Sequence, residues 1–439
     1  MSQTILINKK IKKFNASIKV GGDKSLSIRW VLFSSLASGV STAKNLLMSE
    51  DVIAAIKTIK KLGIKVYINK NICKIYGTGI NGYRYIKNLK INAQNSGTLG
   101  RLILGLLVNS PFPIKIVGDK SLSKRDFKRI ADPLKKFGVK LKLSKNKFLP
   151  LTILGQKKLK PIIYQENKGS AQCKSAVIFA GMRTDGQTII KAKKSRNHTE
   201  LLSRHLNLPI KVIKKKNYDL IKINKVKKIK SINYDIPCDI SSSAFFIVLT
   251  ILNTDSKLII KNVNINPSRI GIITILKKMG AKITFKNKRI YKGERNADIK
   301  IISPKKLKSI DCPPSLNSSA IDEFLVIFLV AAKASGVSYF KNLDELNQKE
   351  SPRLKWGVKI LNEMGVKTIS TNNSIKIFGN PKLSVNKKII IKKYLRDHRV
   401  FMTSVIAGLS FGGEWKIHNK ESINSSFPNF LKIINNLNN

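Results

Sequence analysis

The sequence predicts an α/β protein built from six similar units, which we expect to form two domains of three units each. Six strongly apolar helices, each opening with a serine or an aspartate, recur along the 439 residues at intervals of 71, 74, 72, 80 and 75 residues. Each of these helices is followed by a second helix and by short strands rich in β-branched residues. Self-similarity at a fixed period indicates a repeat architecture.

The first helix of each unit is apolar on nearly all sides and should therefore be buried. A polar residue at the start of a buried helix leaves free N–H groups and the positive end of the helix dipole at one face. Several such ends that converge would form a binding site for anions. The expected first residues of these helices are Ser25, Ser96, Ser170, Ser242, Asp322 and Asp397.

The second helices mostly end at a glycine, as expected where a left-handed residue closes a helix. These glycines are Gly63, Gly138, Gly280 and Gly365. The segments that contain the second helices are 51–66, 126–141, 199–212, 266–283, 352–368 and 426–437. The segments expected as strands include 64–68, 114–118, 257–263 and 387–393.

The chain is strongly basic, with 83 lysines and arginines against 25 aspartates and glutamates and a formal net charge of +58. This charge alone indicates an anionic partner. Lysine, isoleucine and asparagine are abundant together, however, as in proteins from genomes poor in G and C. In residues 221–230, lysines alternate with isoleucine and valine, which predicts a half-buried strand with a solvated basic face. No nucleic-acid-binding motif is present, so we expect no nucleic-acid partner.

The sequence offers no membrane segment and no disulfide framework. Its longest apolar stretch, 324–332, has nine residues, whereas a membrane-spanning helix needs roughly 20. Residues 1–14 show no signal-peptide core. The four cysteines are far apart and lack the CxxC spacing of a zinc site, so we expect reduced thiols in a cytoplasmic protein.

Cations accompany the polar starts of the apolar helices. Lys24, Arg29, Arg101, Lys174 and Arg399 lie in or beside the same turns. Helix capping explains the serines and aspartates but not these cations, which need partners if they are buried. Phosphates and carboxylates of a ligand are the partners that this pattern predicts.

Ten motifs occur in order along the whole chain and together resemble the 5-enolpyruvylshikimate-3-phosphate (EPSP) synthase family. They occupy residues 21–29, 95–102, 118–125, 169–176, 195–200, 237–246, 321–324, 349–353, 397–399 and 425–430. The GDKS, SAQCK and RNHTE segments resemble the class II form of the enzyme, which tends to be less sensitive to glyphosate. Gly97, by contrast, leaves the room that glyphosate needs, so the two indications oppose each other.

The resemblance implies the enolpyruvyl transferase fold, an inside-out α/β barrel with two lobes of three βαβαββ units and buried helices. The N-terminal lobe would span 23–239, the C-terminal lobe 1–22 plus 240–439, and the active site would lie in the cleft between them. The family transfers the enolpyruvyl group of phosphoenolpyruvate to the 5-hydroxyl of shikimate 3-phosphate, in the pathway to chorismate and aromatic amino acids. It breaks a C–O bond, so we expect no cofactor and no metal, and we expect a monomer.

Matching each motif to the family implies a set of site residues. Asp322 would accept the hydroxyl proton, Glu350 would help to protonate the methylene carbon, and Lys24 would contact both substrates. The residues implied for shikimate 3-phosphate are Lys24, Ser25, Arg29, Ser170, Ala171, Gln172, Arg196, Asp322 and Lys349. Those implied for phosphoenolpyruvate are Lys24, Gly97, Arg125, Gln172, Arg353 and Arg399.

Simpler roles remain open for several of these residues. Asp322 could serve only as the N-cap of the helix that follows, and Arg196 could be an ordinary surface cation. Lys174 could pack its stem along a helix and is left out of the site, and His198 is expected to be structural. Asp126 departs from the family pattern in a way that bears on affinity more than on reaction type, as do Phe127, Asn197 and Ser425.

Two other functions compete with this one. The sister enzyme on the same fold transfers enolpyruvate to UDP-N-acetylglucosamine and uses a loop cysteine, but residues 112–127 contain no cysteine. A non-catalytic polyanion-binding protein would exploit the charge of +58, and its binding would have to survive physiological salt. A relic that binds without turnover is a weaker alternative, because Lys24, Asp322 and Glu350 are all present.

Overall fold

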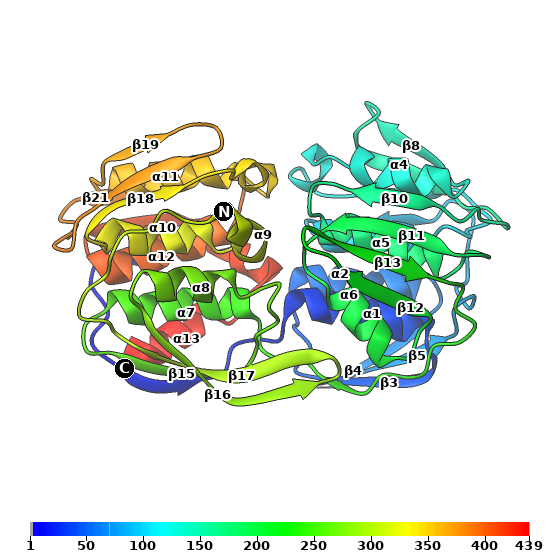
Figure 1. Ribbon diagram of the computed structural model, residues 1–439, viewed down its shortest axis with the longest axis horizontal. Helices are drawn as coiled ribbons and strands as arrows, with labels where there is room; N and C mark the ends of the chain where they lie inside the picture. The colour runs from blue at the N-terminus through cyan, green and yellow to red at the C-terminus, as the bar shows by residue number, and fades with distance from the viewer. Residues whose placement is uncertain (1–2, 70, 439) are drawn as a thin grey trace. The chain divides into compact units, whose positions relative to one another are not determined.

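The structure is a computed structural model that describes residues 3–69 and 71–438. Contacts divide the chain into two compact units, which we call unit 1 and unit 2 (Figure 1). Unit 1 comprises residues 1–21, 237–290 and 295–439, and unit 2 comprises 22–236 and 291–294. The chain therefore leaves unit 1 after Gly21, returns to it at Pro237, and contributes one short hairpin tip to unit 2.

Unit 2 contains three four-stranded sheets and six α-helices among its described residues. The helices are α1 Lys24–Leu36, α2 Glu50–Lys61, α3 Gly97–Leu106, α4 Lys128–Lys136, α5 Ala171–Gly181 and α6 His198–His205, with a 3-10 turn η1 at Leu122–Lys124. The first sheet has the strand order β14 (Tyr234–Asp235), β3 (Ser38–Lys44), β5 (Ile72–Thr78), β4 (Lys65–Asn69). The second has the order β6 (Lys90–Asn92), β7 (Ile114–Val117), β9 (Phe148–Leu154), β8 (Lys140–Ser144). The third has the order β10 (Ile163–Glu166), β11 (Thr188–Lys193), β13 (Tyr218–Ile223), β12 (Ile210–Lys214).

Unit 1 has the same kind of architecture with some shorter sheets. Its helices are α7 Ile240–Leu252, α8 Gly271–Lys278, α9 Asn317–Ala320, α10 Phe324–Lys333, α11 Arg353–Glu363, α12 His398–Phe411 and α13 Phe430–Asn438, with 3-10 turns η2 Pro314–Leu316, η3 Asp344–Gln348 and η4 Lys420–Ser425. The first sheet has the strand order β16 (Lys282–Tyr291), β17 (Glu294–Ile302), β15 (Lys257–Asn264), β2 (Asn15–Ile18). The second has the order β18 (Gly336–Phe340), β20 (Ile375–Gly379), β19 (Thr368–Ser370). The third has the order β1 (Thr4–Ile7), β22 (Glu414–His418), β21 (Lys388–Ile391).

Each four-stranded sheet of unit 2 repeats one mixed pattern of pairing. Its first strand pairs in parallel with the second, and the remaining pairs are antiparallel, as in β14–β3–β5–β4. The same order recurs in the sheets that contain β7 and β11. The predicted repetition of α/β units is thus present as a repeated sheet.

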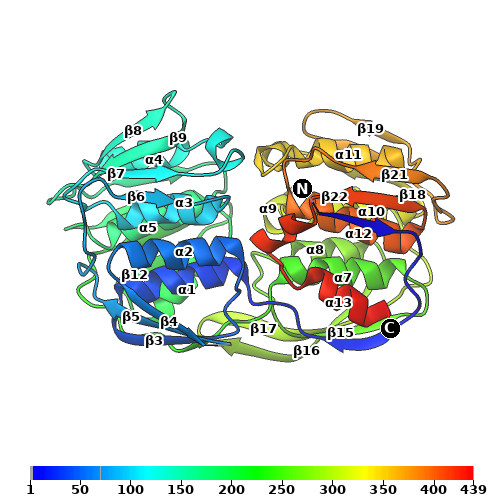
Figure 2. The ribbon, with the colours of Figure 1, turned by 180° about the vertical axis from the view of Figure 1, so that it is seen from behind.

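The apolar helices form the core of each unit, as their sequences predict. In unit 1, α7, α10 and α12 pack on one another (Figure 2), and every residue of α7 and α12 is buried. In unit 2, α3 packs against both α1 and α5. Because these helices have no polar face to present to water, the sheets and the second helices must cover them.

Three of the six predicted helix starts are confirmed by their capping bonds. The side chains of Ser96, Ser170 and Asp397 accept hydrogen bonds from the backbone N–H groups of Leu99, Cys173 and Arg399. Each bond satisfies one of the N–H groups that a helix start leaves without an intrahelical partner.

The other three predicted starts were wrong by one to three residues. Asp23 caps α1 in place of Ser25, and Asp239 caps α7 in place of Ser242. In both places the aspartate carboxylate reaches an amide of the first turn, and the serines lie inside the helix. Asp322 precedes α10, which begins at Phe324, and the Asp322 carboxylate pairs with Lys349 and Arg353.

The glycines expected to close the second helices do so. Gly63, Gly138, Gly280 and Gly365 have φ angles of +87°, +99°, +93° and +81°. A side chain is strained in this left-handed region, so glycine is the favoured residue there. The predicted strand over 221–230 was wrong beyond Ile223, where β13 ends.

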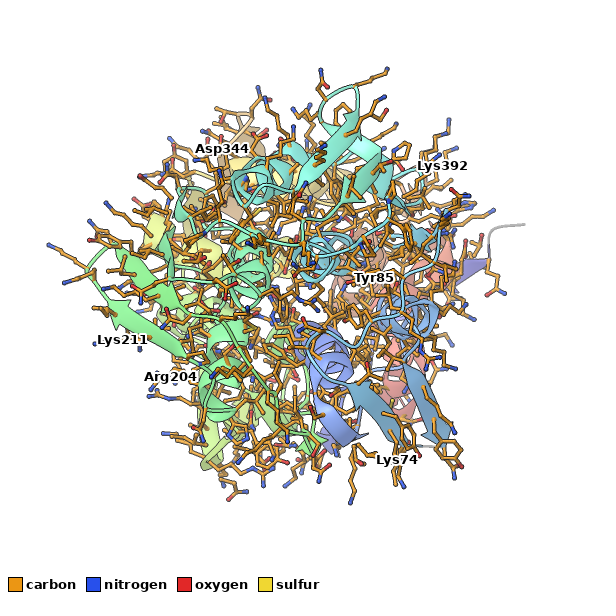
Figure 3. The ribbon with its side chains drawn as sticks, turned by 90° about the vertical axis from the view of Figure 1, so that its right-hand side faces the viewer. Lys74, Tyr85, Arg204, Lys211, Asp344 and Lys392 are labelled. Carbon is orange, nitrogen blue, oxygen red and sulfur yellow. The ribbon has the colours of Figure 1, made fainter. Side chains whose placement is uncertain are left out.

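The positive charge is spread over the surface. Figure 3 shows Lys74, Arg204 and Lys211 of unit 2 pointing outwards, and all three are exposed. Among the described residues, no helix is long and apolar enough to cross a bilayer, and no cluster of histidine, cysteine, aspartate or glutamate could hold a metal ion.

The buried cysteines give a test of this fold. All four thiols are free and buried, and burial raises the pKa of both Cys73 and Cys312 to about 11. Only the thiolate attacks a disulfide reagent, so the native protein at pH 8 should show almost no reaction with 5,5′-dithiobis(2-nitrobenzoate). After unfolding in guanidinium chloride, four equivalents should react. Reaction of the native protein at the rate of a free thiol would contradict the packing described here.

Candidate active site

The first residue of α1 is an ion-paired lysine. Lys24 Nζ lies 2.9 Å from Asp51 Oδ2, and the two side chains are 19% and 8% exposed. Asp51 lies in the first turn of α2, where a carboxylate also interacts favourably with the helix dipole. The pair fixes the ammonium group at the start of a buried helix, yet leaves part of it accessible to a ligand.

The described hydrogen bonds of Arg29, one turn further along α1, go to neutral groups. Its Nε donates to Thr199 Oγ1 at 2.8 Å, one Nη to Ser175 Oγ at 3.1 Å, and the other to the Ser25 carbonyl at 3.0 Å. The Ser175 and Thr199 hydroxyls lie 2.7 Å apart and share a hydrogen bond. The arginine therefore connects the starts of α1, α5 and α6 without a carboxylate in this set of bonds.

The start of α5 presents Ser170, Ala171 and Gln172, in that order. Gln172 Nε2 donates to Thr98 Oγ1 at 3.0 Å, and its Oε1 accepts from Arg101 at 2.6 Å. Burial lowers the pKa of Arg101 to about 10. Gln172 thus bridges the starts of α3 and α5.

Arg125 lies just after η1 and near the start of α3. One of its Nη atoms donates to Asn95 Oδ1 at 3.3 Å. A Cβ placed on Gly97 would come within 2.9 Å of Arg125 Nη1 and 3.0 Å of Arg101 Nη1. Glycine at this position therefore lets two guanidinium groups approach the backbone at the first residue of α3.

Phe127 lies two residues after Arg125 and is anchored in the core. It is fully buried, its N–H donates to the Lys147 carbonyl at 2.8 Å, and the Arg101 guanidinium lies 5.0 Å from its ring centroid. The altered sequence after Arg125 is therefore tied to the surrounding structure.

Lys174 and His198, which the motifs did not place in the binding set, are buried, and each contacts a glutamate. Lys174 Nζ lies 2.7 Å from Glu200 Oε1, and both side chains are buried. His198 Nδ1 lies 2.7 Å from Glu294 Oε1, at the hairpin tip that groups with unit 2. His198 therefore has the structural position that was predicted, and the half-buried Arg196 precedes it in the loop before α6.

Unit 1 gathers its predicted site residues around one buried arginine. Arg353, the first residue of α11, is 1% exposed. It donates to Asp397 Oδ2 at 2.9 Å and to Asp322 Oδ1 at 3.2 Å, and it makes a short ion pair with Glu350 Oε2. Lys349 Nζ lies 3.3 Å from Asp322 Oδ1. Three carboxylates from three separate segments thus converge on one guanidinium.

The electrostatics of Arg353 follow from this arrangement. Burial alone would lower its pKa, but Asp397, Glu350 and Asp322 outweigh that effect and raise the pKa above its usual value. The guanidinium therefore stays charged.

Arg399 completes the group at the start of α12. Its Nη1 donates to the backbone carbonyl of Asp322 at 2.6 Å, and its backbone N–H donates to Asp397 Oδ1 at 2.9 Å. The same Nη1 lies 3.7 Å from Glu323 Oε1. The structure therefore brings Asp322, Lys349, Glu350, Arg353 and Arg399 together, as the motifs predicted.

Several members of this arrangement were missed. Asp51, Thr98, Asp397 and Glu323 hold the predicted cations or Gln172 in place, but no role in the site was assigned to them. Asp397 did carry a signal, because it opens a helix directly before His398 and Arg399. Thr98 and Glu323 also lie inside two of the ten motifs, 95–102 and 321–324, whereas Asp51 lies in none. The partners of all three lie far away in the sequence, so no local pattern pairs them.

Asp397 supplies a stability test. Its side chain is fully buried, accepts hydrogen bonds from Arg353, Ser351 and the Arg399 backbone, and caps α12. Asp397→Asn keeps the size but removes the charge opposite a buried guanidinium, so we expect a loss of about 3 kcal/mol of unfolding free energy. In calorimetry the Tm should fall by roughly 5–10 °C. Asp311→Asn, at a side chain that is 69% exposed, is the control and should leave the Tm unchanged. Equal Tm values for the two variants would contradict the packing of Arg353 described above.

Comparison with known proteins identifies relatives over the whole chain. The family described as EPSP synthase (3-phosphoshikimate 1-carboxyvinyltransferase) matches residues 8–434. The 3-phosphoshikimate 1-carboxyvinyltransferase of Endomicrobium trichonymphae is 37% identical over 434 residues, covering 98% of this chain and 99% of the relative. That of Bacillus cytotoxicus is 36% identical over 422 residues, covering 96% and 97%.

Solved structures agree with these matches. An EPSP synthase from Acinetobacter baumannii has a TM-score of 0.86 at 34% identity and covers 100% of this chain and 98% of that chain. The enolpyruvyl transferase NikO from Streptomyces tendae has a TM-score of 0.77 at 13% identity, a likeness that concerns the fold alone. The predicted enolpyruvyl transferase fold is confirmed. With a family match over residues 8–434 and relatives of matching length, the chain belongs to the EPSP synthase family.

Proposed function

We propose that the cluster around Arg353, together with the cations at the starts of α1, α3 and α5, carries out the reaction of this family. As a member of the EPSP synthase family, the chain transfers the enolpyruvyl group of phosphoenolpyruvate to the 5-hydroxyl of shikimate 3-phosphate and releases phosphate. This is 3-phosphoshikimate 1-carboxyvinyltransferase activity, a step in aromatic amino acid biosynthesis. The assignment of individual residues to its steps is our proposal.

One observation carries the proposal: Arg353 bonds to both carboxylates that the motifs assign to proton transfer, Asp322 and Glu350. Phosphoenolpyruvate is a phosphate and a carboxylate on one small molecule, and charge-assisted bonds to arginine are the strongest way to hold it. We assign Arg353, Arg399 and Arg125 to it, with Lys24 and Gln172 beside them. Its anionic groups would compete with Asp322 and Glu350 for the Arg353 guanidinium.

This competition suggests how the carboxylates act. A carboxylate that gives up its guanidinium partner to a substrate anion loses an interaction that favours the ionised form over the protonated form. Glu350 would then supply a proton to the methylene carbon, while Asp322, still beside Lys349, takes the proton of the 5-hydroxyl. The hydroxyl oxygen bonds to the central carbon and gives a tetrahedral intermediate. Loss of phosphate and of one methyl proton from that intermediate regenerates the enol double bond.

Shikimate 3-phosphate fits the groups of unit 2. The first N–H groups of α5 have no intrahelical partners, and the positive end of the helix dipole lies there. We assign its phosphate to Ser170, Ala171, Gln172 and Arg196, with further contacts from Lys24, Ser25 and Arg29. In unit 1 we add Asp322 and Lys349 on the same substrate.

Finer features of the function are also proposals. The GDKS, SAQCK and RNHTE segments support a class II enzyme, and the free, buried cysteines support a location in the reducing cytoplasm. We propose a monomer that needs neither a metal nor a cofactor.

Phosphate release tests the reaction and the two proton carriers. Wild-type protein should release phosphate only when both shikimate 3-phosphate and phosphoenolpyruvate are present. Asp322→Asn and Glu350→Gln keep side-chain size but remove the titrating group, so kcat should fall by about 10²–10⁴-fold. Glu350→Gln should also slow the exchange of solvent deuterium into the methylene group of phosphoenolpyruvate, measured by NMR.

The outcomes of this test are distinct. Asp311→Asn serves as the control and should retain wild-type kcat, because its carboxylate is exposed and pairs only loosely with Lys341. Phosphate release with UDP-N-acetylglucosamine instead of shikimate 3-phosphate would favour the sister enzyme. Full activity in both Asp322→Asn and Glu350→Gln would remove these carboxylates from the mechanism.

Gly97 tests the assignment of Arg125. In Gly97→Ala, the new Cβ would lie 2.9 Å from an Nη of Arg125, so the flexible guanidinium must move. We expect KM for phosphoenolpyruvate to rise roughly tenfold, since small displacements of a clamping arginine are costly. The Tm should not fall, because alanine is favoured over glycine in a helix by about 0.5–1 kcal/mol.

Gly100→Ala is the matched control for this variant. It adds the same methyl group to α3, but the nearest atoms to its Cβ would belong to the side chains of Phe127 and Ala93, at 3.3 and 3.4 Å. KM for phosphoenolpyruvate should therefore stay near the wild-type value. The same increase in both variants would attribute the effect to α3 as a whole and contradict the role of Arg125.

A further inference from the structure

Two consecutive acidic residues in unit 1 lie in different surroundings. The Asp322 side chain is 13% exposed and contacts Lys349 and Arg353. The Glu323 side chain is fully buried, and its Oε1 accepts a hydrogen bond of 2.5 Å from Ser241 Oγ. A buried carboxylate is costly unless it is bonded and paired with a cation, so the position of Glu323 needs an explanation of its own.

The cation nearest to Glu323 among its described contacts is an arginine of the candidate site. Arg399 Nη1 lies 3.7 Å from Glu323 Oε1 and donates to the backbone carbonyl of Asp322 at 2.6 Å. The same guanidinium atom is therefore held from two sides, by the carbonyl of one residue and the carboxylate of the next. These two contacts leave the rest of the guanidinium to bind phosphoenolpyruvate.

Ser241 orients the Glu323 carboxylate. Its hydroxyl donates to Glu323 and at the same time accepts from Arg269 at 2.9 Å. Arg269 is 1% exposed and also bonds to Asp239 Oδ1 at 3.2 Å, and Asp239 caps α7. Because a hydroxyl has only one proton to donate, the Arg269 bond directs that proton towards Glu323.

We propose that Glu323 and Ser241 are positioning residues for Arg399, and through it for the backbone at Asp322. This inference rests on the proposed function, since it takes Arg399 as a ligand of phosphoenolpyruvate. It adds a buried chain of polar groups that runs from Asp239 through Arg269, Ser241 and Glu323 to Arg399. The chain sets the direction of the guanidinium before the substrate arrives, which lowers the cost of binding.

Two variants break the chain at different points. Glu323→Gln keeps an oxygen that can accept from Ser241 but removes the charge opposite Arg399. Ser241→Ala leaves every charge in place and removes only the hydroxyl that orients Glu323. For each variant we expect KM for phosphoenolpyruvate to rise about tenfold and kcat to fall severalfold. The Kd for shikimate 3-phosphate, measured by isothermal titration calorimetry, should stay within about twofold of wild type.

Controls separate positioning from general damage to the fold. Ser241→Thr keeps a hydroxyl at this position, so its KM for phosphoenolpyruvate should stay close to the wild-type value. The KM of Ser241→Ala should be raised. Glu414→Gln removes an exposed carboxylate of the same unit and should behave as wild type. A loss of affinity for both substrates in parallel with a lower Tm would show a purely structural role and overturn the proposal. Should Glu323→Gln fail to fold, Ser241→Ala and Ser241→Thr provide the same comparison.

A double-mutant cycle with Arg399→Lys tests whether Glu323 acts through Arg399. If Glu323 acts through Arg399, then Glu323→Gln should add less than about twofold to the KM of the Arg399→Lys protein. A full tenfold increase in that background, or an unchanged or lowered KM in Glu323→Gln alone, would overturn the proposal. Failure of the proposed function looks different: the wild type would release no phosphate, or Arg399→Lys alone would leave KM for phosphoenolpyruvate unchanged.

Discussion

The burial of the Arg353 guanidinium is the interaction on which unit 1 depends. A buried cation must be surrounded by acceptors, and here the acceptors come from the loop before α10, the loop before α11 and the start of α12. Two of these carboxylates are in turn fixed by a second contact, because Ser351 bonds to Asp397 and Lys349 pairs with Asp322. One charge in the interior thus determines where three segments of the chain must meet.

The described bonds of Arg353 differ from those of the arginines in unit 2. In unit 2 the described bonds join Arg29, Arg101 and Arg125 to hydroxyl, carbonyl and amide oxygens, whereas Lys24 and Lys174 pair with Asp51 and Glu200. In unit 1 the described bonds of Arg353 go to carboxylates. The carboxylates that contact Arg353 are groups able to carry protons, which supports our proposal that this cluster takes part in proton transfer.

The sequence predicts the parts of this structure that depend on neighbours along the chain. Apolar helices, glycines that close helices and capping by Ser96, Ser170 and Asp397 are local properties, and they were predicted from periodicity alone. The contacts of Asp322 were not predicted from periodicity, because an aspartate before an apolar helix is expected to cap that helix. Its carboxylate instead bonds to Arg353, which is 31 residues away. Only the motif resemblance indicated that Asp322 and Arg353 belong together.

The overall composition does not indicate the carboxylates of the site. The chain carries a formal charge of +58, yet the described contacts place the carboxylates of Asp322, Glu323, Glu350 and Asp397 around three cations. Exposed lysines act through water, where charges more than about 8 Å apart are largely screened at physiological salt. Buried pairs at about 3 Å are screened far less. The proposed site therefore contains a small acidic cluster that the overall charge would not suggest, in which each carboxylate contacts an arginine or a lysine.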